Sequence, residues 1–276
     1  MKARKLVLVM ALVGALLLGL ASSGAAITNG KPDGNAHPYV GLLVFDVAGP
    51  GGTTVPAWRC SGALIAPNVV LTAGHCTEGA VAARVWFDEV VQGNPDYPRG
   101  GPSAVEGTPY THPDFCHNCY GPSNGLPAFS YRDVGVVVLS RPVSKPLAAM
   151  PSAGLVDRLA NKTAVTLVGY GVQEKVHVPG GGAPVWAGLR NRLMAPSELV
   201  SGQFVHSNEY MRIALNPGGG SGGTCFGDSG GPDLLGNTHT VLAVNSYVTN
   251  SNCSGVGYSA RVDIPAVLRW IRSFLD

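Results

Sequence analysis

A serine surrounded by glycines near the C-terminal end constrains this chain more than any other feature. Residues 224–232 read Thr-Cys-Phe-Gly-Asp-Ser-Gly-Gly-Pro, with Ser229 near the centre. Glycines on both sides allow a tight turn with positive φ and leave the serine hydroxyl uncovered, and Pro232 ends the turn. In such a turn the backbone N–H groups of Gly227 and Ser229 could bind a developing oxyanion. A glycine-rich loop with a buried serine is the structural alternative.

Two catalytic patterns fit this stretch, and chain order distinguishes them. The Gly-x-Ser-x-Gly at 227–231 also matches the nucleophile elbow of α/β-hydrolases, in which an acid and then a histidine follow the serine. Only 47 residues follow Ser229, and their one histidine, His239, comes ten residues later. Upstream, His75 lies in Leu-Thr-Ala-Gly-His-Cys, and Asp133 opens an apolar run at 134–139. The order histidine, aspartate, serine is that of chymotrypsin-like proteases.

The chain resembles the trypsin/chymotrypsin family of serine proteases in four places that span nearly all of it after residue 26. These are Thr-Ala-Gly-His-Cys at 72–76, Asp133 before its apolar run, Gly-Asp-Ser-Gly-Gly-Pro at 227–232, and Ile-Thr-Asn-Gly at 27–30, which is similar to the family's mature N-terminus. The resemblance implies an all-β fold of two antiparallel six-stranded β-barrels followed by a C-terminal α-helix. The barrels are expected at about 27–145 and 146–262, and the helix at about 263–276.

The first 26 residues have the pattern of a secretory signal peptide. Three basic residues among the first five precede an apolar run at 6–20, and small residues fill 21–26. The run of 15 residues is short for the ~20 that a membrane helix needs, and an uncleaved anchor is the alternative. We therefore expect a secreted, extracellular peptidase domain at 27–276, with no membrane association after cleavage.

The charge balance excludes some partners. Without residues 1–26 the chain has 16 basic and 17 acidic residues. A chain so close to neutrality has no electrostatic case for binding nucleic acid or an anionic membrane. The 38 glycines and 21 prolines suit a loop-rich all-β protein. The expected partners are protein or peptide substrates, and a proteinaceous inhibitor is a further candidate. We expect a monomer without cofactor or metal.

Short apolar or alternating runs bounded by glycine and proline predict strands. In the first half they cover residues 40–45, 62–71, 82–87 and 134–139, and the second run is a hairpin that turns at Pro67 and Asn68, just before His75. In the second half they cover 164–168, 188–194, 210–214 and 241–244. After Pro265 the apolar residues fall at helical spacing, which predicts the C-terminal helix.

Six cysteines in an exported chain predict three disulfides, for which 15 pairings are possible. The family resemblance implies two of them. Cys60 and Cys76 flank the histidine loop, and Cys225 and Cys253 join the serine loop to the far wall of the substrate pocket.

The remaining two cysteines, Cys116 and Cys119, have no common counterpart in the family. A local disulfide in a surface loop is the expected structure. A metal site that includes His112 and His117, or a redox pair, is the alternative. A redox pair needs a helix N-terminus to lower a thiol pKa, whereas the surrounding prolines and glycine indicate a loop.

The resemblance assigns a role to each member of the triad. Ser229 is the nucleophile, and His75, whose pKa lies near working pH, takes its proton and passes it to the leaving amine. Asp133 holds the imidazole in the right tautomer and stabilises its charged form. A structural histidine beside a disulfide and a carboxylate cap at a strand end are the non-catalytic alternatives.

Asp228 lies between two glycines beside the nucleophile, where an unpaired charge would be costly to bury. In the family this position pairs with the α-ammonium that cleavage creates, which here would be that of Ile27. The last basic residue before Ile27 is Lys5, so no Lys or Arg marks a propeptide cleavage site. Gly24 and Ala26 are instead the small residues that signal peptidase accepts at positions −3 and −1. Export alone is therefore expected to produce the active N-terminus.

The resemblance also implies an uncharged substrate pocket, closer to the elastase or chymotrypsin branches than to trypsin. Gly223 stands at the base, where trypsin-like members carry aspartate, and neither 216–227 nor 246–261 contains an acid. Val248 replaces a glycine of open-pocket members and narrows the neck, so that small or medium apolar residues fit. The pocket residues are Gly223, Thr224, Phe226, Ser246, Tyr247, Val248 and Gly255, the last with Gly257 as its alternative.

Two functions fit these motifs. One is a secreted serine endopeptidase that works through a Ser-His-Asp triad and an acyl-enzyme. The other is a non-catalytic binding module on the same fold, and such modules commonly lack a triad member. All three members are present here, together with the oxyanion glycine, which favours the enzyme.

Overall fold

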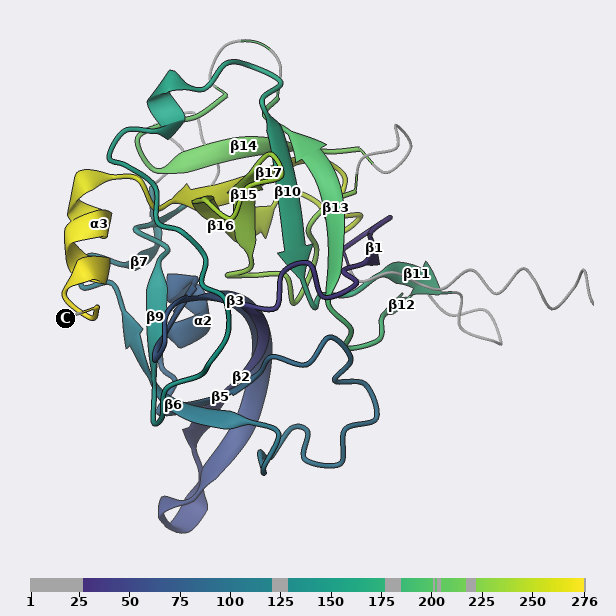
Figure 1. The fold of residues 1–276 in the computed structure, drawn as a ribbon, viewed down its shortest axis with the longest axis vertical. Coiled ribbons are helices and arrows are strands. Elements are labelled where there is room, and N and C mark those ends of the chain that lie inside the picture. The colour runs from purple at the N-terminus through teal and green to yellow at the C-terminus, as the bar shows by residue number, and fades with distance from the viewer. Residues whose placement is uncertain are drawn as a thin grey trace, which may run out of the picture.

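The computed structural model describes residues 27–120, 129–176, 185–200, 202, 205–216 and 222–275, so the predicted signal peptide lies outside the described residues. Two β-structures lie side by side, with a helix against one flank (Figure 1). Within the described ranges, no helix is long and apolar enough to span a membrane.

The first half of the chain forms a closed barrel of six antiparallel strands. They pair in the order β2-β3-β4-β9-β6-β5. Their bounds are β2 (Val40–Ala48), β3 (Thr54–Ala66), β4 (Val69–Thr72), β5 (Ala82–Trp86), β6 (Val105–Thr111) and β9 (Gly135–Leu139). The expected unbroken apolar strand is β9, whose residues are mostly buried between β4 and β6. One of the two apolar clusters lies in this barrel and continues into the second half, where it includes Val168 and Val244.

The second half forms a seven-stranded antiparallel sheet in the order β1-β13-β10-β15-β16-β17-β14. The strands are β1 (Lys31–Pro32), β10 (Ala164–Gly169), β13 (Leu193–Glu198), β14 (Tyr210–Leu215), β15 (Pro232–Leu235), β16 (Val241–Val248) and β17 (Gly255–Arg261). Leu199, just after β13, forms an isolated bridge with Ile213 of β14, and the Val200 N–H donates to the Arg212 carbonyl at 3.2 Å. The predicted all-β fold with one closed six-stranded barrel is confirmed, whereas the second half is a seven-stranded sheet that closes only partly, because β1 adds an edge strand and β13 and β14 do not pair as a ladder among the described residues.

Two short hairpins and three short helical turns complete the described elements. The hairpins are β7 (Cys116–Tyr120) with β8 (Phe129–Tyr131), and β11 (Glu174–Val176) with β12 (Val185–Ala187). The turns are η1 (Pro50–Gly52), α2 (Gly74–Thr77) and η3 (Val156–Arg158). Two sequence predictions are wrong here. The cysteine pair lies in a strand rather than a loop, and the strand expected at 188–194 begins only at Leu193 because the glycine-containing residues before it form a connection.

The C-terminal helix α3 (Pro265–Arg272) begins at a proline, as expected, and buries Val267, Leu268 and Ile271. Although it follows the second sheet, it packs against the first barrel (Figure 1). Its Trp270 ring lies 4.9 Å from the His112 ring. The helix therefore ties the end of the chain back to the first half.

A buried arginine lies where the two halves meet. The Arg192 side chain is fully buried and donates from Nε to Asp33 Oδ2 at 2.9 Å. Its Nη1 lies within hydrogen-bond distance of the carbonyls of Val40 and Phe87 in the first half and of the Tyr170 hydroxyl in the second. One guanidinium thus joins the N-terminal segment, the first barrel and Tyr170, which directly follows β10.

Asp233 on β15 is a buried carboxyl without such compensation. Within the described part of the chain, neither of its oxygens accepts a hydrogen bond of ordinary geometry, and the residue is fully buried. Burial raises the pKa of Asp233 to about 7. The native state therefore binds this proton more tightly than an unfolded chain, in which the aspartate pKa is about 3.9.

We predict that Asp233→Asn stabilises the protein at alkaline pH. Between pH ~4 and ~7 the native protein carries more protons than the unfolded chain, so the free energy of unfolding falls as pH rises through that window. Because asparagine has no charge to bury, this fall shrinks, and the variant gains about 1–4 kcal/mol at pH 8. Urea unfolding at pH 5 and pH 8 measures the difference. The control is Asp114→Asn on an exposed carboxylate, and an equal pH dependence in all three proteins would contradict the prediction.

Candidate active site

His75 and Asp133 meet at the edge of the first barrel. His75 lies in the short helix α2 after β4, and Asp133 lies just before β9. The backbone N–H of His75 donates to Asp133 Oδ1 at 2.7 Å, and His75 Nδ1 lies 2.8 Å from Oδ2. Gly74 allows this approach, because a Cβ there would lie 3.2 Å from Asp133 Oδ1 and 2.9 Å from the Phe115 ring.

The ionisation of this pair follows from its contacts. Burial lowers the pKa of His75, but the charge of Asp133 and the hydrogen bond to it outweigh burial, so the pKa lies above its ordinary value. Burial raises the pKa of Asp133, and the contacts with His75 together with the Ser246 hydroxyl outweigh it, so the carboxyl stays ionised. The Ser246 hydroxyl donates to Asp133 Oδ2. The pair therefore has a charged acid and a basic imidazole.

Two successive tight turns, at 225–228 and 228–231, hold Ser229, which lies in the second. The Asp228 N–H donates to the Cys225 carbonyl at 3.0 Å, and the Gly231 N–H donates to the Asp228 carbonyl at 2.8 Å. Each turn has a glycine with positive φ at its third position, Gly227 at 94° and Gly230 at 75°. This is the pattern of type II turns, which require a residue that tolerates positive φ. At Gly230 a side chain would also collide with Thr72 Oγ1, 2.1 Å from its Cβ position.

These turns leave two backbone N–H groups without acceptors. The Phe226 carbonyl accepts a hydrogen bond from the Val172 N–H at 2.8 Å. Because C=O and N–H point in opposite directions across a trans peptide, the Gly227 N–H is directed away from Val172. Among the described residues, no carbonyl accepts from the N–H groups of Gly227 or Ser229. The two groups predicted to form an oxyanion hole are thus available to a ligand.

Ser61 on β3 fixes this loop, and the sequence analysis did not identify it. Its hydroxyl donates to the Gly227 carbonyl at 3.0 Å and accepts from the Tyr170 N–H at 3.0 Å. Its own N–H donates to the Ser229 carbonyl at 2.8 Å. A serine after a strand cysteine has no distinguishing sequence pattern, so only the contact between the two halves shows its role.

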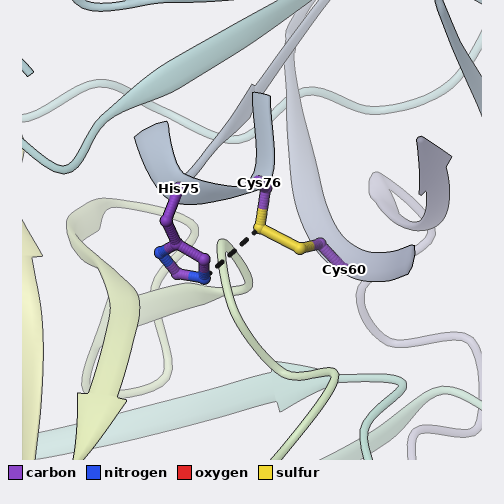
Figure 2. A group of neighbouring side chains, drawn as sticks. All are labelled: Cys60, His75 and Cys76. Atoms are coloured by element: carbon purple, nitrogen blue, oxygen red, sulfur yellow. Dashed lines mark hydrogen bonds between the residues drawn. A yellow bond between two sulfur atoms is a disulfide. The ribbon is translucent and has the colours of Figure 1, made fainter. Parts of the chain in front are cut away.

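Ser229 and His75 lie in one site but are not joined by a hydrogen bond. Ser229 lines a cavity together with Ser246, whose hydroxyl contacts Asp133. Figure 2 shows His75 Nε2 directed at the Cys60–Cys76 disulfide, 3.6 Å from Cys76 Sγ. Within the described residues no hydrogen bond links Ser229 Oγ to the imidazole. Such contacts are often long in ligand-free sites and tighten when substrate binds.

Two clusters suggest metal ligands, and the structure gives both another role. Ligand atoms of Cys60, His75 and Cys76 lie within 4.8 Å of one another (Figure 2). Cysteine binds metals as thiolate, and both sulfurs are in a disulfide. Cys116 and Cys119 are also joined, as the local-bridge interpretation predicts. His112 and His117 bond elsewhere, to the Asp114 N–H and the Ser130 hydroxyl.

Asp228 is fully buried behind the serine loop. Its oxygens accept from the Gly171 N–H at 2.8 Å and the Cys225 N–H at 3.0 Å. Burial nevertheless raises its pKa to about 7. Ile27 is also fully buried, and the next residue, Thr28, forms a bridge with Gly223. Ile27 thus lies near Gly223, at one end of the segment 223–228, and Asp228 is the residue at the other end. An ion pair between them requires cleavage before Ile27, because only a free α-ammonium carries the charge.

A cavity of about 140 Å³ opens beside Ser229. Five of the seven predicted pocket residues line it: Thr224, Phe226, Ser246, Tyr247 and Val248. Cys225 and Asn245 also line it, and Cys225 is joined to Cys253 as predicted. Gly223 and Gly255 are not among the lining residues. Gly223 faces Thr28 and Leu215, and Gly255 lies in open space at the start of β17.

The family model described as Trypsin matches residues 33–271. The chain belongs to the trypsin family of serine endopeptidases. The match covers both halves of the fold and includes His75, Asp133 and Ser229, the three residues predicted to form a triad. The family's substrates are proteins and peptides.

Individual relatives agree with this assignment. Brachyurin from Leptuca pugilator is 29% identical over 245 residues, which cover 87% of this chain and 93% of brachyurin. A solved structure of HL collagenase superposes with a TM-score of 0.61 at 20% identity, covering 91% of this chain and 96% of the other. Human heparin binding protein gives a TM-score of 0.59 at 18% identity, covering 90% and 96%. At these identities the two solved structures show a shared fold.

Proposed function

We propose that this chain is a secreted endopeptidase that cleaves peptide bonds with Ser229, His75 and Asp133 as its catalytic triad. The observation that carries the proposal is the hydrogen-bonded His75–Asp133 pair beside a serine in a turn with two available N–H groups. His75 takes the Ser229 proton as the hydroxyl oxygen bonds to the substrate carbonyl carbon. It then gives that proton to the leaving amine, and water repeats the sequence on the acyl-enzyme.

The backbone supplies the charge stabilisation. As the carbonyl carbon becomes tetrahedral its oxygen acquires negative charge, and the N–H groups of Gly227 and Ser229 are free to bind that oxygen. Donors that are already oriented need no reorganisation at the moment of reaction. The Val172 N–H holds the Phe226 carbonyl of the peptide that carries the Gly227 N–H, and the Gly231 N–H holds the Asp228 carbonyl of the peptide that carries the Ser229 N–H. These bonds keep both donors oriented.

The alternative is a binding module without catalysis. A protein titled human heparin binding protein shares the fold, and at 18% identity this likeness carries no function over to the present chain. The complete His75–Asp133 pair favours the enzyme.

We predict that Ser229→Ala, His75→Ala and Asp133→Ala each abolish nearly all peptidase activity. Because oxyanion binding remains, a rate of ~10³–10⁴-fold over water should persist, a magnitude taken over from serine proteases in general. Peptide hydrolysis and labelling with a fluorophosphonate measure this outcome, and Ser140→Ala at an exposed position is the matched control. Wild-type turnover in Ser229→Ala, or a wild-type chain that neither labels nor hydrolyses, would leave the binding module as the function.

For specificity, we propose cleavage after small or medium apolar residues. The cavity is small and its lining residues carry no acid. Val248 lines it and pairs with Gly257 across β16 and β17. A lysine or arginine would bury its charge there unpaired, which costs several kcal/mol.

A peptide library should therefore show cleavage after residues such as alanine and valine, and little after arginine or lysine. Removing the Val248 side chain widens the space, so Val248→Gly should shift the profile toward larger apolar residues. Val185→Gly, at an exposed valine of β12, is the control. A profile dominated by arginine would refute the specificity proposal and leave the catalytic one intact.

For activation, we propose that removal of residues 1–26 is sufficient. The freed α-ammonium of Ile27 would give the buried Asp228 carboxylate an ion-pair partner, which it does not have among the described residues. This supports the loop between Gly227 and Ser229, since breaking a buried ion pair by removing one partner costs about 3–5 kcal/mol. The Thr28–Gly223 bridge already holds the first residues against this segment.

A chain that begins at Ile27 should be at least tenfold more active than one that retains Ala26, because the extra residue replaces the ammonium by an amide. Asp228→Asn in the Ile27 chain should lose activity to a similar extent. Hydrolysis of one peptide by all three measures this, with active sites counted by titration. Equal activity with and without Ala26 would reject the mechanism, as would a native N-terminus several residues from Ile27. Secretion, the monomeric state and control by an inhibitor stay predictions from the sequence.

A further inference from the structure

Arg59 lies against residues 227–229, whose N–H groups are proposed to bind the oxyanion; we call this segment the oxyanion loop. Arg59 is on β3, two residues before Ser61, so both side chains point to the same face of the strand. That face meets the serine loop, because the Ser61 hydroxyl bonds the Gly227 carbonyl. Arg59 Nε lies 3.4 Å from the position that a Cβ on Gly227 would occupy. The arginine therefore borders the site where the substrate carbonyl is expected.

The Arg59 side chain is partly exposed and has no carboxylate partner among the described residues. Burial raises the pKa of Asp228 behind the loop, and the charge of Arg59 opposes that effect in part. A guanidinium that forms no internal ion pair is available to an anionic group on a ligand, and its planar fork suits a carboxylate.

The geometry indicates which part of a substrate would meet Arg59. The cavity for the acyl-side residue is lined by β16, and the Gly230 N–H bonds the Asn245 carbonyl on that side. On its other side the loop is held by β3, through the Ser61 N–H and the Ser229 carbonyl. A peptide with its acyl side chain in the cavity thus extends its leaving segment along β3. Two residues of extended chain span about 7 Å, which brings a side chain within reach of Arg59.

We propose that Arg59 makes this peptidase prefer an acidic residue at the first or second position after the cleaved bond. The proposal rests on the proposed function and specifies the leaving half of its substrates. Because the site is partly open to water, the gain corresponds to an ordinary ion pair, about two- to fivefold in kcat/KM. Salt should reduce it.

The test compares peptides that share one apolar acyl-side sequence and carry Glu or Gln at each of the two positions after the cleaved bond. The wild type should cleave one Glu peptide about two- to fivefold better than its Gln counterpart at low salt. Arg59→Gln should bring that ratio to one, and Arg59→Lys should keep it above one. Arg272→Gln, at an exposed arginine of α3, should leave it unchanged.

A peptide anilide, which has no residue after the cleaved bond, separates specificity from loop damage. Arg59→Gln should hydrolyse it at the wild-type rate, and an equal loss on anilide and peptides would mean that Arg59 only supports the loop. If the variant does not fold, the wild-type Glu/Gln ratio at low and high salt decides instead. A salt-independent ratio of one at both positions overturns this proposal alone. Absence of both cleavage and fluorophosphonate labelling overturns the proposed function with it.

Discussion

The relative position of the two halves depends on one buried cation, the guanidinium of Arg192. A charge without access to water is tolerated only if hydrogen bonds and a countercharge replace its hydration. Here Asp33 supplies the countercharge, and Asn35, Val40, Phe87 and Tyr170 supply oxygen acceptors from both halves. Removing Asp33 or Asn35, the acceptors of Nε and Nη2, would leave that part of the fork unsatisfied, so the contact has few alternative geometries. An apolar contact of the same size would permit sliding, whereas this one fixes the halves in register.

The candidate site needs that register because neither half contains it. The first barrel contributes the imidazole of His75, the carboxylate of Asp133 and the hydroxyl of Ser61, whereas the second contributes the turn with Ser229 and the hydroxyl of Ser246. Hydrogen bonds of about 3 Å cross the boundary, and a shift of 1 Å would break them. The helix α3 also holds the two halves together, since it follows the second half in the sequence and packs on the first barrel.

The motif residues could be predicted from the sequence, because glycines with positive φ and a strand-end aspartate leave local signs. The triad pair, the disulfide partners and the all-β fold follow from such signs together with the family resemblance. Residues whose importance comes only from contact between distant segments could not be found this way. From the sequence alone, Arg192 would be assigned to the surface, Asp233 would be an ordinary polar residue in a strand, and Ser61 would be a small residue beside a cysteine. The hairpin at Cys116 was missed because proline and glycine around it mark a loop, while cross-strand pairing with Tyr131 makes it a strand.

Strand β3 shows how one element can serve both architecture and chemistry. Alternation directs Arg59 and Ser61 to the oxyanion loop, and it directs Cys60, between them, to the disulfide beside His75. A slip of one residue in the pairing of β3 with β2 would exchange these faces. It would place Cys60 toward the serine loop and remove the bond that orients the Gly227 peptide. The nine paired positions along β2 and β3 oppose such a slip. The stable pairing of the barrel strands thus fixes the position of the loop where a substrate carbonyl would be bound.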